Sequence, residues 1–418
     1  MSEFQKYELN DLVDLITGFP FKSNEYSYNG KLRVVRGENV SVGFLRWDSE
    51  KFWDHSTEKL EKYLLNESDI IIGMDGSRVG RNRAIIKKRD LPLLLAQRVA
   101  KLQAKKNVCQ KFIWYNIFNN NFTNYIESIC TGTSIPHISP TQIKEYELIA
   151  PSYNEQKAIA SVLSSLDDKI DLLHRQNETL EKMVETLFRK CFVEPYKRYQ
   201  SEGIIIDEFQ LETFLKWISE TVGGEWGKEV MDNDFSKAAI CLRGTDIADL
   251  NSGLAEKAPI RFVKPKKFEN IEPQNGDILI EISGGTETQS TGRTTYINDE
   301  VRSLFDYELV FSNFCRLIKI KDFRYSYFVY SYLQYLYKQD EFFNLENGSS
   351  GIKNLDYKTL LFDLKFPMPS EDLVLNFHDT VEPLFKKINK NKLQIKSLSK
   401  LRDTLLPKLM SGEVRVKE

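Results

Sequence analysis

The sequence predicts a mixed α/β protein with a pseudo-two-fold repeat, in which two similar domains are separated by two long helices that form an antiparallel coiled coil. Three observations predict this class. The two halves carry the same motifs in the same order, each half mixes short β-branched runs with helical stretches, and each half ends in a heptad series. The expected parts are a first domain at 1–150, a first spacer helix at 151–195, a second domain at 196–368, and a second spacer helix with the tail at 369–418.

The repeat rests on four pairs of motifs. An arginine–glycine step opens each half, an Asp followed by an apolar run leads into a Gly-rich loop, and a Gly-Ser/Thr loop and a Pro-Ser step come later. The matched residues are Arg36 with Arg243, Asp69 with Asp277, Gly132 with Gly348, and Pro151 with Pro369. The offset grows from 207 (243 − 36) to 218 (369 − 151) residues. Insertions in loops account for such drift.

The two heptad series predict the helix pairing. Apolar residues recur at alternating steps of four and three over 159–187 and again over 377–405, with Arg402 as one imperfect position. When Asn177 is placed opposite Asn391 in an antiparallel pair, all the remaining layers join apolar residues. The one exception is the layer that contains Arg402. We predict that these two asparagines hydrogen-bond and fix the register of the coiled coil. The alternative is that each helix belongs only to the core of its own domain.

Composition and cysteine usage narrow the class of protein. A chain of 418 residues with 41% apolar and 12% aromatic residues is long enough for two or three packed domains. The N-terminus has no secretory signal pattern, and no apolar run reaches the length of a membrane span. The five cysteines are scattered without C-x-x-C pairs, which is typical of reduced thiols in a cytoplasmic protein.

Charge distribution indicates a nucleic-acid contact. The net charge is only −2, yet six of the twelve residues from Arg78 to Arg89 are basic and none is acidic. Such a local patch on a near-neutral chain suits a protein that reads DNA and leaves wrong sites quickly, although a solvated charged face is the simpler alternative. The candidate DNA contacts of this kind are Arg78, Arg81, Arg83, Lys87 and Lys88, with Arg293 and Thr294 after the second Gly-rich loop.

Polar loops near the predicted helix starts supply further candidates. Hydroxyl, amide and amine groups there can bind base edges or phosphates, but ordinary turn chemistry explains them equally well. The residues are Thr133, Ser134 and His137 in the first half, and Ser349, Ser350, Lys353 and Asn354 in the second.

No catalytic or metal-binding motif accompanies these candidates. The sequence has no G-x-x-x-x-G-K-[ST] phosphate loop and no Asn-Pro-Pro-Tyr/Phe string of the kind that adenine methyltransferases use. Asp277 and Glu281 lack the lysine of an Asp…Glu-x-Lys nuclease, because position 283 is Ser. The four histidines show no metal-ligand spacing. We therefore expect a non-catalytic protein with no metal site.

Four strings give the chain a resemblance to a known family. They are 132–138, 150–160, 276–285 and the C-terminal 405–416. In this order, and within a tandem repeat, they resemble the specificity subunits of type I restriction-modification systems over essentially the whole chain. One departure is that Lys353 and its neighbours do not repeat the Pro-His step at His137, which puts the role of that step in doubt.

The resemblance implies two target-recognition domains that each read one half of a DNA site. It also implies two modification subunits that bind S-adenosylmethionine and methylate adenine N6, and restriction subunits that use ATP and Mg²⁺, so that no cofactor binds this chain. We expect the modification subunits to dock along the helices and the tail, with Leu405, Leu406, Leu409 and Val414 at the interface. The alternative function is a scaffold for protein partners that does not bind DNA.

The predicted coiled coil also has a length that suits DNA. The first heptad series spans 28 residue steps (187 − 159), or about 42 Å at about 1.5 Å per residue. Half-sites on one face of B-DNA lie about 34–36 Å apart. Because the two domains differ in sequence, we expect a bipartite and asymmetric target with unread base pairs in the middle.

Overall fold

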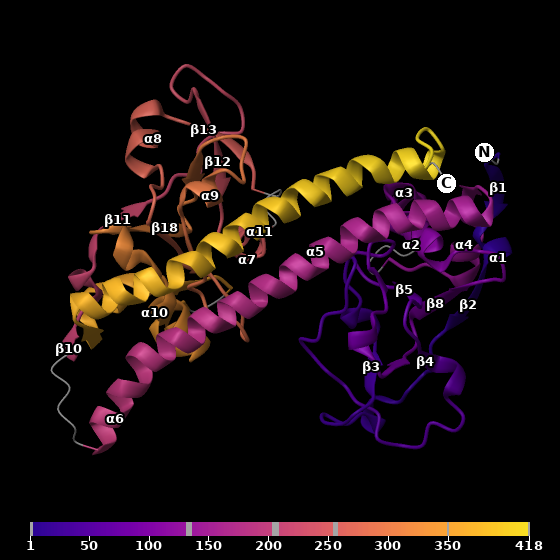
Figure 1. Cartoon of the computed structure of the whole chain (residues 1–418), viewed down its shortest axis with the longest axis horizontal. Coiled ribbons are helices and arrows are strands. Elements are labelled where there is room, and N and C mark those ends of the chain that lie inside the picture. Colours follow the sequence, from indigo (N-terminus) through magenta and orange to yellow (C-terminus); the bar gives the residue numbers. More distant parts are fainter. Residues whose placement is uncertain (1–2, 131–135, 203–208, 254–257, 349–350, 417–418) are drawn as a thin grey trace. The chain divides into compact units, whose positions relative to one another are not determined.

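The computed structural model describes residues 3–130, 136–202, 209–253, 258–348 and 351–416 (Figure 1). The chain forms two compact units. Unit 1 consists of residues 1–168 and 400–418, and unit 2 of residues 169–399. Both are mixed α/β, as predicted. Among the described residues, no helix has the length and apolar character needed to cross a lipid bilayer.

Unit 1 is built on two sheets and a small strand pair. The four-stranded sheet is antiparallel in the order β2 (Val13–Thr17), β8 (Val99–Ala104), β5 (Ile70–Gly73), β6 (Arg83–Ile85). The three-stranded sheet has the order β3 (Arg33–Val35), β7 (Leu93–Leu95), β4 (Leu64–Leu65), and β1 (Gln5–Glu8) pairs with β9 (Glu147–Ala150). The α-helices before the long one are α1 (Leu9–Leu12), α2 (Gln110–Phe118), α3 (Asn120–Ile129) and α4 (Pro140–Lys144). Buried side chains of β5 and α2 belong to its main core cluster.

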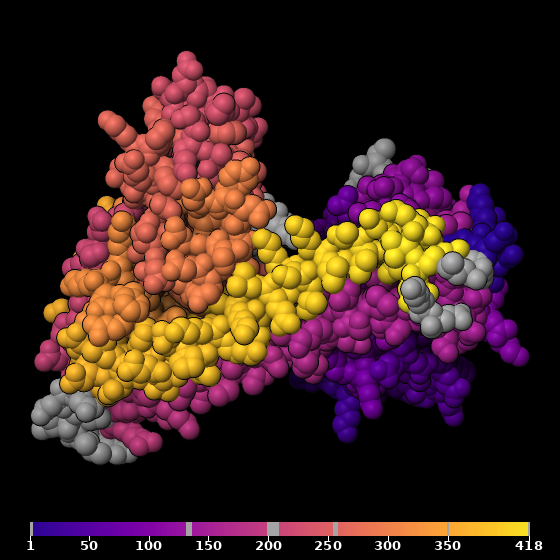
Figure 2. Space-filling model, turned by 45° about the horizontal axis from the view of Figure 1, so that its top comes forward, coloured from indigo at the N-terminus to yellow at the C-terminus, as the bar shows by residue number. Residues whose placement is uncertain are grey.

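Unit 2 has the same plan with additional strands. Its four-stranded antiparallel sheet has the order β11 (Ile218–Gly223), β18 (Cys315–Ile320), β14 (Ile278–Glu281), β16 (Thr294–Tyr296). Its other strands are β13 (Ile260–Val263), β12 (Lys237–Leu242) and β17 (Leu309–Phe311) in one sheet, β15 (Ser283–Gly284), β20 (Lys353–Leu355) and β19 (Glu346–Asn347) in another, and the pair β10 (Phe209–Glu212) and β21 (Phe366–Pro369). The shorter α-helices are α7 (Asp246–Asn251), α8 (Pro265–Ile271), α9 (Asp299–Arg302) and α10 (Ser326–Lys338). Figure 2 shows the layer with β12, β13 and α8 at the top of unit 2, in red to orange.

Matching hydrogen bonds relate the two units in detail. The Asp69 carboxylate accepts from the backbone N–H of Asn66 at 2.8 Å. The Asp277 carboxylate accepts from that of Gln274 at the same distance. The parallel strand pair β3–β7 of unit 1 corresponds to β12–β17 of unit 2. The third strand differs, because β4 pairs with β7 whereas β13 pairs with β12. The repeated motifs therefore mark a shared topology, and one edge of the smaller sheet varies.

Two long helices contribute residues to both units. The first is α5 (Tyr153–Phe188), which continues through a π-helical turn (Arg189–Val193) into α6 (Glu194–Glu202), and the second is α11 (Glu371–Ser411). In unit 2 they run antiparallel, since Asn177 contacts Asn391 while Phe188 lies against Phe377, with ring centroids 6.2 Å apart. The amide Nδ2 of Asn391 donates to Oδ1 of Asn177 at 2.8 Å, so the predicted hydrogen bond is present. Its role in fixing the register stays a prediction.

In unit 1 the same two helices pair antiparallel through charged contacts. The Arg402 guanidinium donates to Asp167 at 2.9 Å, and Arg415 pairs with the buried carboxylate of Glu155. The hydroxyl of Tyr115 also donates to Asp167 at 2.7 Å. Arg402 was the imperfect position of the second heptad series, and this ion pair explains why a charge is tolerated there.

The C-terminal end of α11 corrects one prediction. Leu406 and Leu409 are buried in the main core cluster of unit 1, together with Met410. Leu405 is half-buried against the same cluster, and only Val414 of the predicted partner interface is exposed. The apolar side chains of this segment therefore serve intramolecular packing, so Leu406 and Leu409 are not available to a partner protein.

Candidate nucleic-acid interface

A cavity of about 740 Å³ opens in unit 2 where the Gly-rich loop after β14 meets the turn after β12. Its lining combines guanidinium, amide, hydroxyl and aromatic groups. The residues are Trp226, Arg243, Gly244, Thr245, Glu281, Ser283, Gly284, Gly285, Thr286, Gln289, Arg293, Asn313 and Phe314. Groups of these kinds bind base edges, sugars and phosphates in protein–DNA complexes. We take this cavity as the candidate site of unit 2.

The turn after β12 holds the first arginine of the site. Asp246 accepts from the backbone N–H of Arg243 at 2.9 Å, and from its Nε and Nη2 at 2.8 and 2.7 Å. These side-chain hydrogen bonds raise the pKa of Arg243 above its ordinary value. Gly244 follows because a Cβ there would lie 2.5 Å from the Glu281 carboxylate. The Arg-Gly-x-Asp sequence thus builds a turn that keeps the guanidinium in a fixed place at the rim.

The second arginine comes from the segment before β16. Arg293 donates through Nε and Nη2 to the two carboxylate oxygens of Glu281 at 2.9 and 2.5 Å. Glu281 ends β14 and is only 1% exposed, whereas the Arg293 side chain is 20% exposed and lines the cavity. The hydrogen bonds to Glu281 raise the pKa of Arg293. A buried carboxylate paired in this geometry positions a permanently charged guanidinium.

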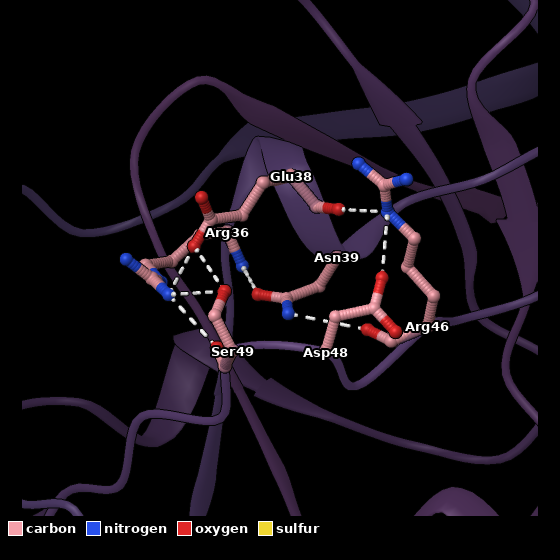
Figure 3. Close-up of polar contacts among 6 residues, drawn as sticks. All are labelled: Arg36, Glu38, Asn39, Arg46, Asp48 and Ser49. Carbon is pink, nitrogen blue, oxygen red and sulfur yellow. Dashed lines mark hydrogen bonds and ion pairs between the residues drawn. The ribbon is translucent and has the colours of Figure 1, made fainter. Parts of the chain in front are cut away.

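Unit 1 has the same turn with different partners (Figure 3). Asn39 takes the place of Asp246 and accepts from the backbone N–H of Arg36 at 3.0 Å. The Arg36 guanidinium instead contacts the Glu38 carboxylate and donates to the backbone oxygen of Ser49 at 3.0 Å. Arg46 closes the other side of this cluster by donating to the backbone oxygen of Glu38 at 2.7 Å. The equivalent arginine of unit 1 is therefore anchored by neighbouring loop residues.

A second cluster of unit 1 lies just beyond β5. Asp75 contacts the imidazole Nδ1 of His137 and accepts from Arg98 at 2.8 Å. The backbones of Asp75 and His137 form an isolated antiparallel bridge, as Ser283 and Asn354 pair in unit 2. There the Ser283 hydroxyl donates to the Asn354 amide oxygen at 2.8 Å. The predicted residues His137 and Asn354 therefore occupy corresponding places beside corresponding loops.

Comparison with known proteins agrees with this architecture. A family model described as type I restriction modification DNA specificity domain matches residues 1–182. The MjaIX specificity subunit of Methanocaldococcus jannaschii is 28% identical over 339 residues, covering 78% of this chain and 74% of that protein. The EcoAI specificity subunit of Escherichia coli is 34% identical over 166 residues, covering 38% of this chain and 27% of that protein. The chain is thus similar to the specificity subunits of type I restriction-modification systems.

A solved structure shares the fold of the whole chain. The crystal structure of the type I restriction-modification S subunit from M. genitalium superposes with a TM-score of 0.58 at 20% identity. The match covers 98% of this chain and 96% of that one. This likeness shows that the chain shares the fold of that S subunit.

The structure places one of the predicted DNA contacts of this chain in the protein interior. Arg83 is 3% exposed and donates to the backbone oxygen of Phe118 and to Thr123 Oγ1, both at 2.8 Å. Its guanidinium also contacts the backbone oxygen of Gly80, and burial lowers its pKa to about 10. Arg83 is thus a structural residue, and the prediction that it contacts DNA is wrong. The alternating basic pattern did not indicate that Arg83 is buried. Arg83 is the first residue of β6, and its side chain points into the core.

The remaining basic candidates of unit 1 lie at the surface. Arg78, Arg81 and Lys88 are exposed, and Lys87 is half-buried. Arg81 pairs with Glu127 at 2.7 Å. Their part in DNA binding stays a prediction.

In unit 2 the candidates divide between surface and core. Arg293 lines the cavity, and Asn354 is exposed on β20 next to it. Lys353 is half-buried and pairs with Glu346 at 2.9 Å. Thr294 is 1% exposed and accepts from Gln334, so it does not face a ligand, and its predicted DNA contact is wrong. Four further candidates lie outside the described residues, namely Thr133, Ser134, Ser349 and Ser350.

Sequence reasoning missed several residues of the cavity. Glu281 and Arg243 were not among the predicted DNA contacts, although Glu281 lies in the 276–285 string and Arg243 marks the repeat. Gln289 lies in the second Gly-rich loop without having been singled out, and Trp226 and Asn313 lie in no motif. A usable signal was present in Glu281, because a carboxylate at the end of an otherwise apolar strand is costly unless a cation pairs with it.

A matched pair of variants tests the reassignment of Arg83. We expect Arg83→Ala to lower the free energy of unfolding of unit 1 by about 2 kcal/mol, because buried acceptors lose their charged donor. Arg81→Ala, which breaks only a surface ion pair, should change it by less than about 0.5 kcal/mol. Urea denaturation measures the free energy of unfolding of both variants. Hydrogen-exchange protection of β5 and β6 assigns the change to unit 1. Equal effects for the two variants would contradict the assignment.

Proposed function

We propose that this chain is the sequence-reading subunit of a type I restriction-modification enzyme and carries no catalytic group of its own. Unit 1 and unit 2 each bind one half of a bipartite, asymmetric DNA target. The observation that supports this most is the repeated turn, in which Arg36 and Arg243 are each anchored beside the end of a core strand. Because the anchors differ between the units, the two half-sites differ.

The long helices act as the spacer of this reader in our proposal. They pair antiparallel within each unit and hold an asparagine pair in unit 2. In this proposal the antiparallel coiled coil connects two similar readers. Such a connection suits half-sites that are related by the two-fold symmetry of the DNA backbone.

The catalytic steps belong to partner subunits in this proposal. Modification subunits that bind S-adenosylmethionine would methylate one adenine in each half-site, and restriction subunits would use ATP and Mg²⁺. With Leu406 and Leu409 buried, the docking surface for the modification subunits consists of exposed side chains of the helices and of Val414.

Selection from a library of randomised duplexes tests the function. The full-length chain, alone and with its modification subunits, should select two short half-sites separated by unread base pairs, with affinity that falls steeply with salt. Inserting one heptad into each helix adds about 10.5 Å. The unread spacer should therefore grow by about three base pairs, at about 3.4 Å each, while both half-sites stay the same.

Two results would contradict the proposal. If the chain selects no duplex sequence in either form, the scaffold alternative is favoured. If the inserted heptads leave the spacer unchanged, the helices do not set the distance between the half-sites.

A further inference from the structure

The buried Glu281–Arg293 pair of unit 2 has a donor arrangement that points to a ligand. An arginine side chain carries five N–H donors in one plane. Glu281 takes the side of the guanidinium formed by Nε and Nη2. This leaves the end-on edge, where one N–H of Nη1 and one of Nη2 point the same way. No other described residue accepts a hydrogen bond from this guanidinium.

Arg293 lines the cavity, so a planar ligand in the cavity would lie beside its guanidinium. Two glycines on the loop after β14 keep side chains out of it, since a Cβ at Gly284 would lie 2.4 Å from the Glu281 carboxylate and one at Gly285 would lie 2.7 Å from Thr291. Both glycines have positive φ angles, +159° and +74°. The aromatic ring of Phe314 lines the same cavity and is 49% exposed. Arg293 therefore lines an open recess of the surface, while Glu281 stays buried behind it.

The chemistry of the edge selects one base. Two parallel donors match two adjacent acceptors, and in the major groove only guanine offers them, at N7 and O6. Adenine presents one acceptor and one donor, cytosine a donor, and thymine a single acceptor with a methyl group. We propose that Arg293, oriented by Glu281, reads a guanine in the half-site of unit 2. This rests on the proposed function of the chain as a DNA reader.

Unit 1 lacks this device at the matching positions. The backbone N–H of Glu281 donates to Arg293 O at 2.9 Å, and that of Gly73 donates to Asn82 O at 2.8 Å. Gly73 and Asn82 thus stand where unit 2 has the carboxylate and the guanidinium. The guanine preference accordingly belongs to one half-site only.

Selection from randomised duplexes by the full-length chain with its modification subunits, using three variants, tests this inference. Arg293→Ala and Arg293→Lys should each reduce the preference for guanine at one position by roughly ten- to a hundredfold, with all other positions unchanged. Lysine keeps the charge and the pairing with Glu281 but has no end-on pair of donors. Glu281→Gln keeps the shape and removes the charge, so the same preference should weaken by a smaller factor.

Arg302→Ala is the matched control within unit 2. Arg302 also pairs with a carboxylate, Glu272 at 2.7 Å, but it does not line the cavity. Its replacement should leave every base preference as it is. Thermal unfolding of each variant shows whether it is folded. If Arg293→Ala is unfolded, Arg293→Lys still tests the inference.

The outcomes separate this inference from the proposed function. Uniform weakening on all sequences would assign Arg293 to a phosphate and overturn the inference, and so would unchanged base preference in Arg293→Lys. Either result leaves the proposed function standing, because the wild-type chain would still select its two half-sites. If the wild-type chain selects no duplex sequence, the proposed function fails and the inference fails with it.

Discussion

Removal of residues 407–418 is expected to unfold unit 1, although the segment is the far end of the chain. The deletion takes away Leu409, which is 2% exposed, and Met410, which is 5% exposed, from the main core of that unit. It also removes Arg415, the partner of the buried carboxylate of Glu155. Loss of this ion pair adds to the cavity left by the two apolar side chains.

The point variant Leu409→Ala isolates the packing part of this effect. We expect it to lower the free energy of unfolding by about 2–5 kcal/mol, as other large-to-small core substitutions do. Hydrogen exchange should show lost protection in β5 and β8 of unit 1, while β14 and β18 of unit 2 stay protected. Val414→Ala, at an exposed position of the same tail, is the control and should change stability by less than about 0.5 kcal/mol. Normal protection of β5 in the truncated chain would contradict this prediction.

This result changes how partner binding can be studied. In a test of the proposed binding to a modification subunit, a tail deletion would abolish binding simply because unit 1 unfolds. Substitutions at exposed side chains, such as Val414 in the tail and Met183 in α5, leave the core intact. These positions are suited to locating the interface.

The long-range features of the fold could be predicted because they repeat. The two heptad series place Asn177 and Asn391 in the same layer of an antiparallel pair, and the structure has a 2.8 Å hydrogen bond between the two amides. The turn at Arg36 and that at Arg243 could be matched because the residue three positions later must cap the turn in both. Backbone requirements of this kind leave the same residue types at the same spacing.

Side-chain direction and chain-end packing could not be predicted in the same way. A basic residue on a short strand faces either solvent or core, and nothing in the local pattern told Arg83 from Arg81. The contacts that bury Arg83 come from α2 and α3, far along the chain, at Phe118 and Thr123. Likewise, the sequence alone does not show that Leu409 packs into the core of unit 1, because its partners there lie far away along the chain.

The asparagine layer of unit 2 carries the second large expected effect. Asn391 is fully buried, and Asn177 is 6% exposed. Replacing Asn391 with Leu leaves the Asn177 amide oxygen without its donor, and the other amide contact of Asn177, to Ile388 O, is long at 3.4 Å. We expect each single variant, Asn177→Leu or Asn391→Leu, to lose about 1–3 kcal/mol of unfolding free energy.

The double variant Asn177→Leu/Asn391→Leu should recover most of that loss or exceed the wild-type stability. Two leucines complete an apolar layer, whereas the native pair leaves Asn391 Oδ1 buried and without a partner among the described residues. A double-mutant cycle from urea denaturation of the full-length chain measures the coupling. Additive losses would mean that the two amides do not act together. Recovery would mean that the polar layer lowers stability. Its presence is then explained by register, because a wholly apolar seam permits slipped pairings of the two helices.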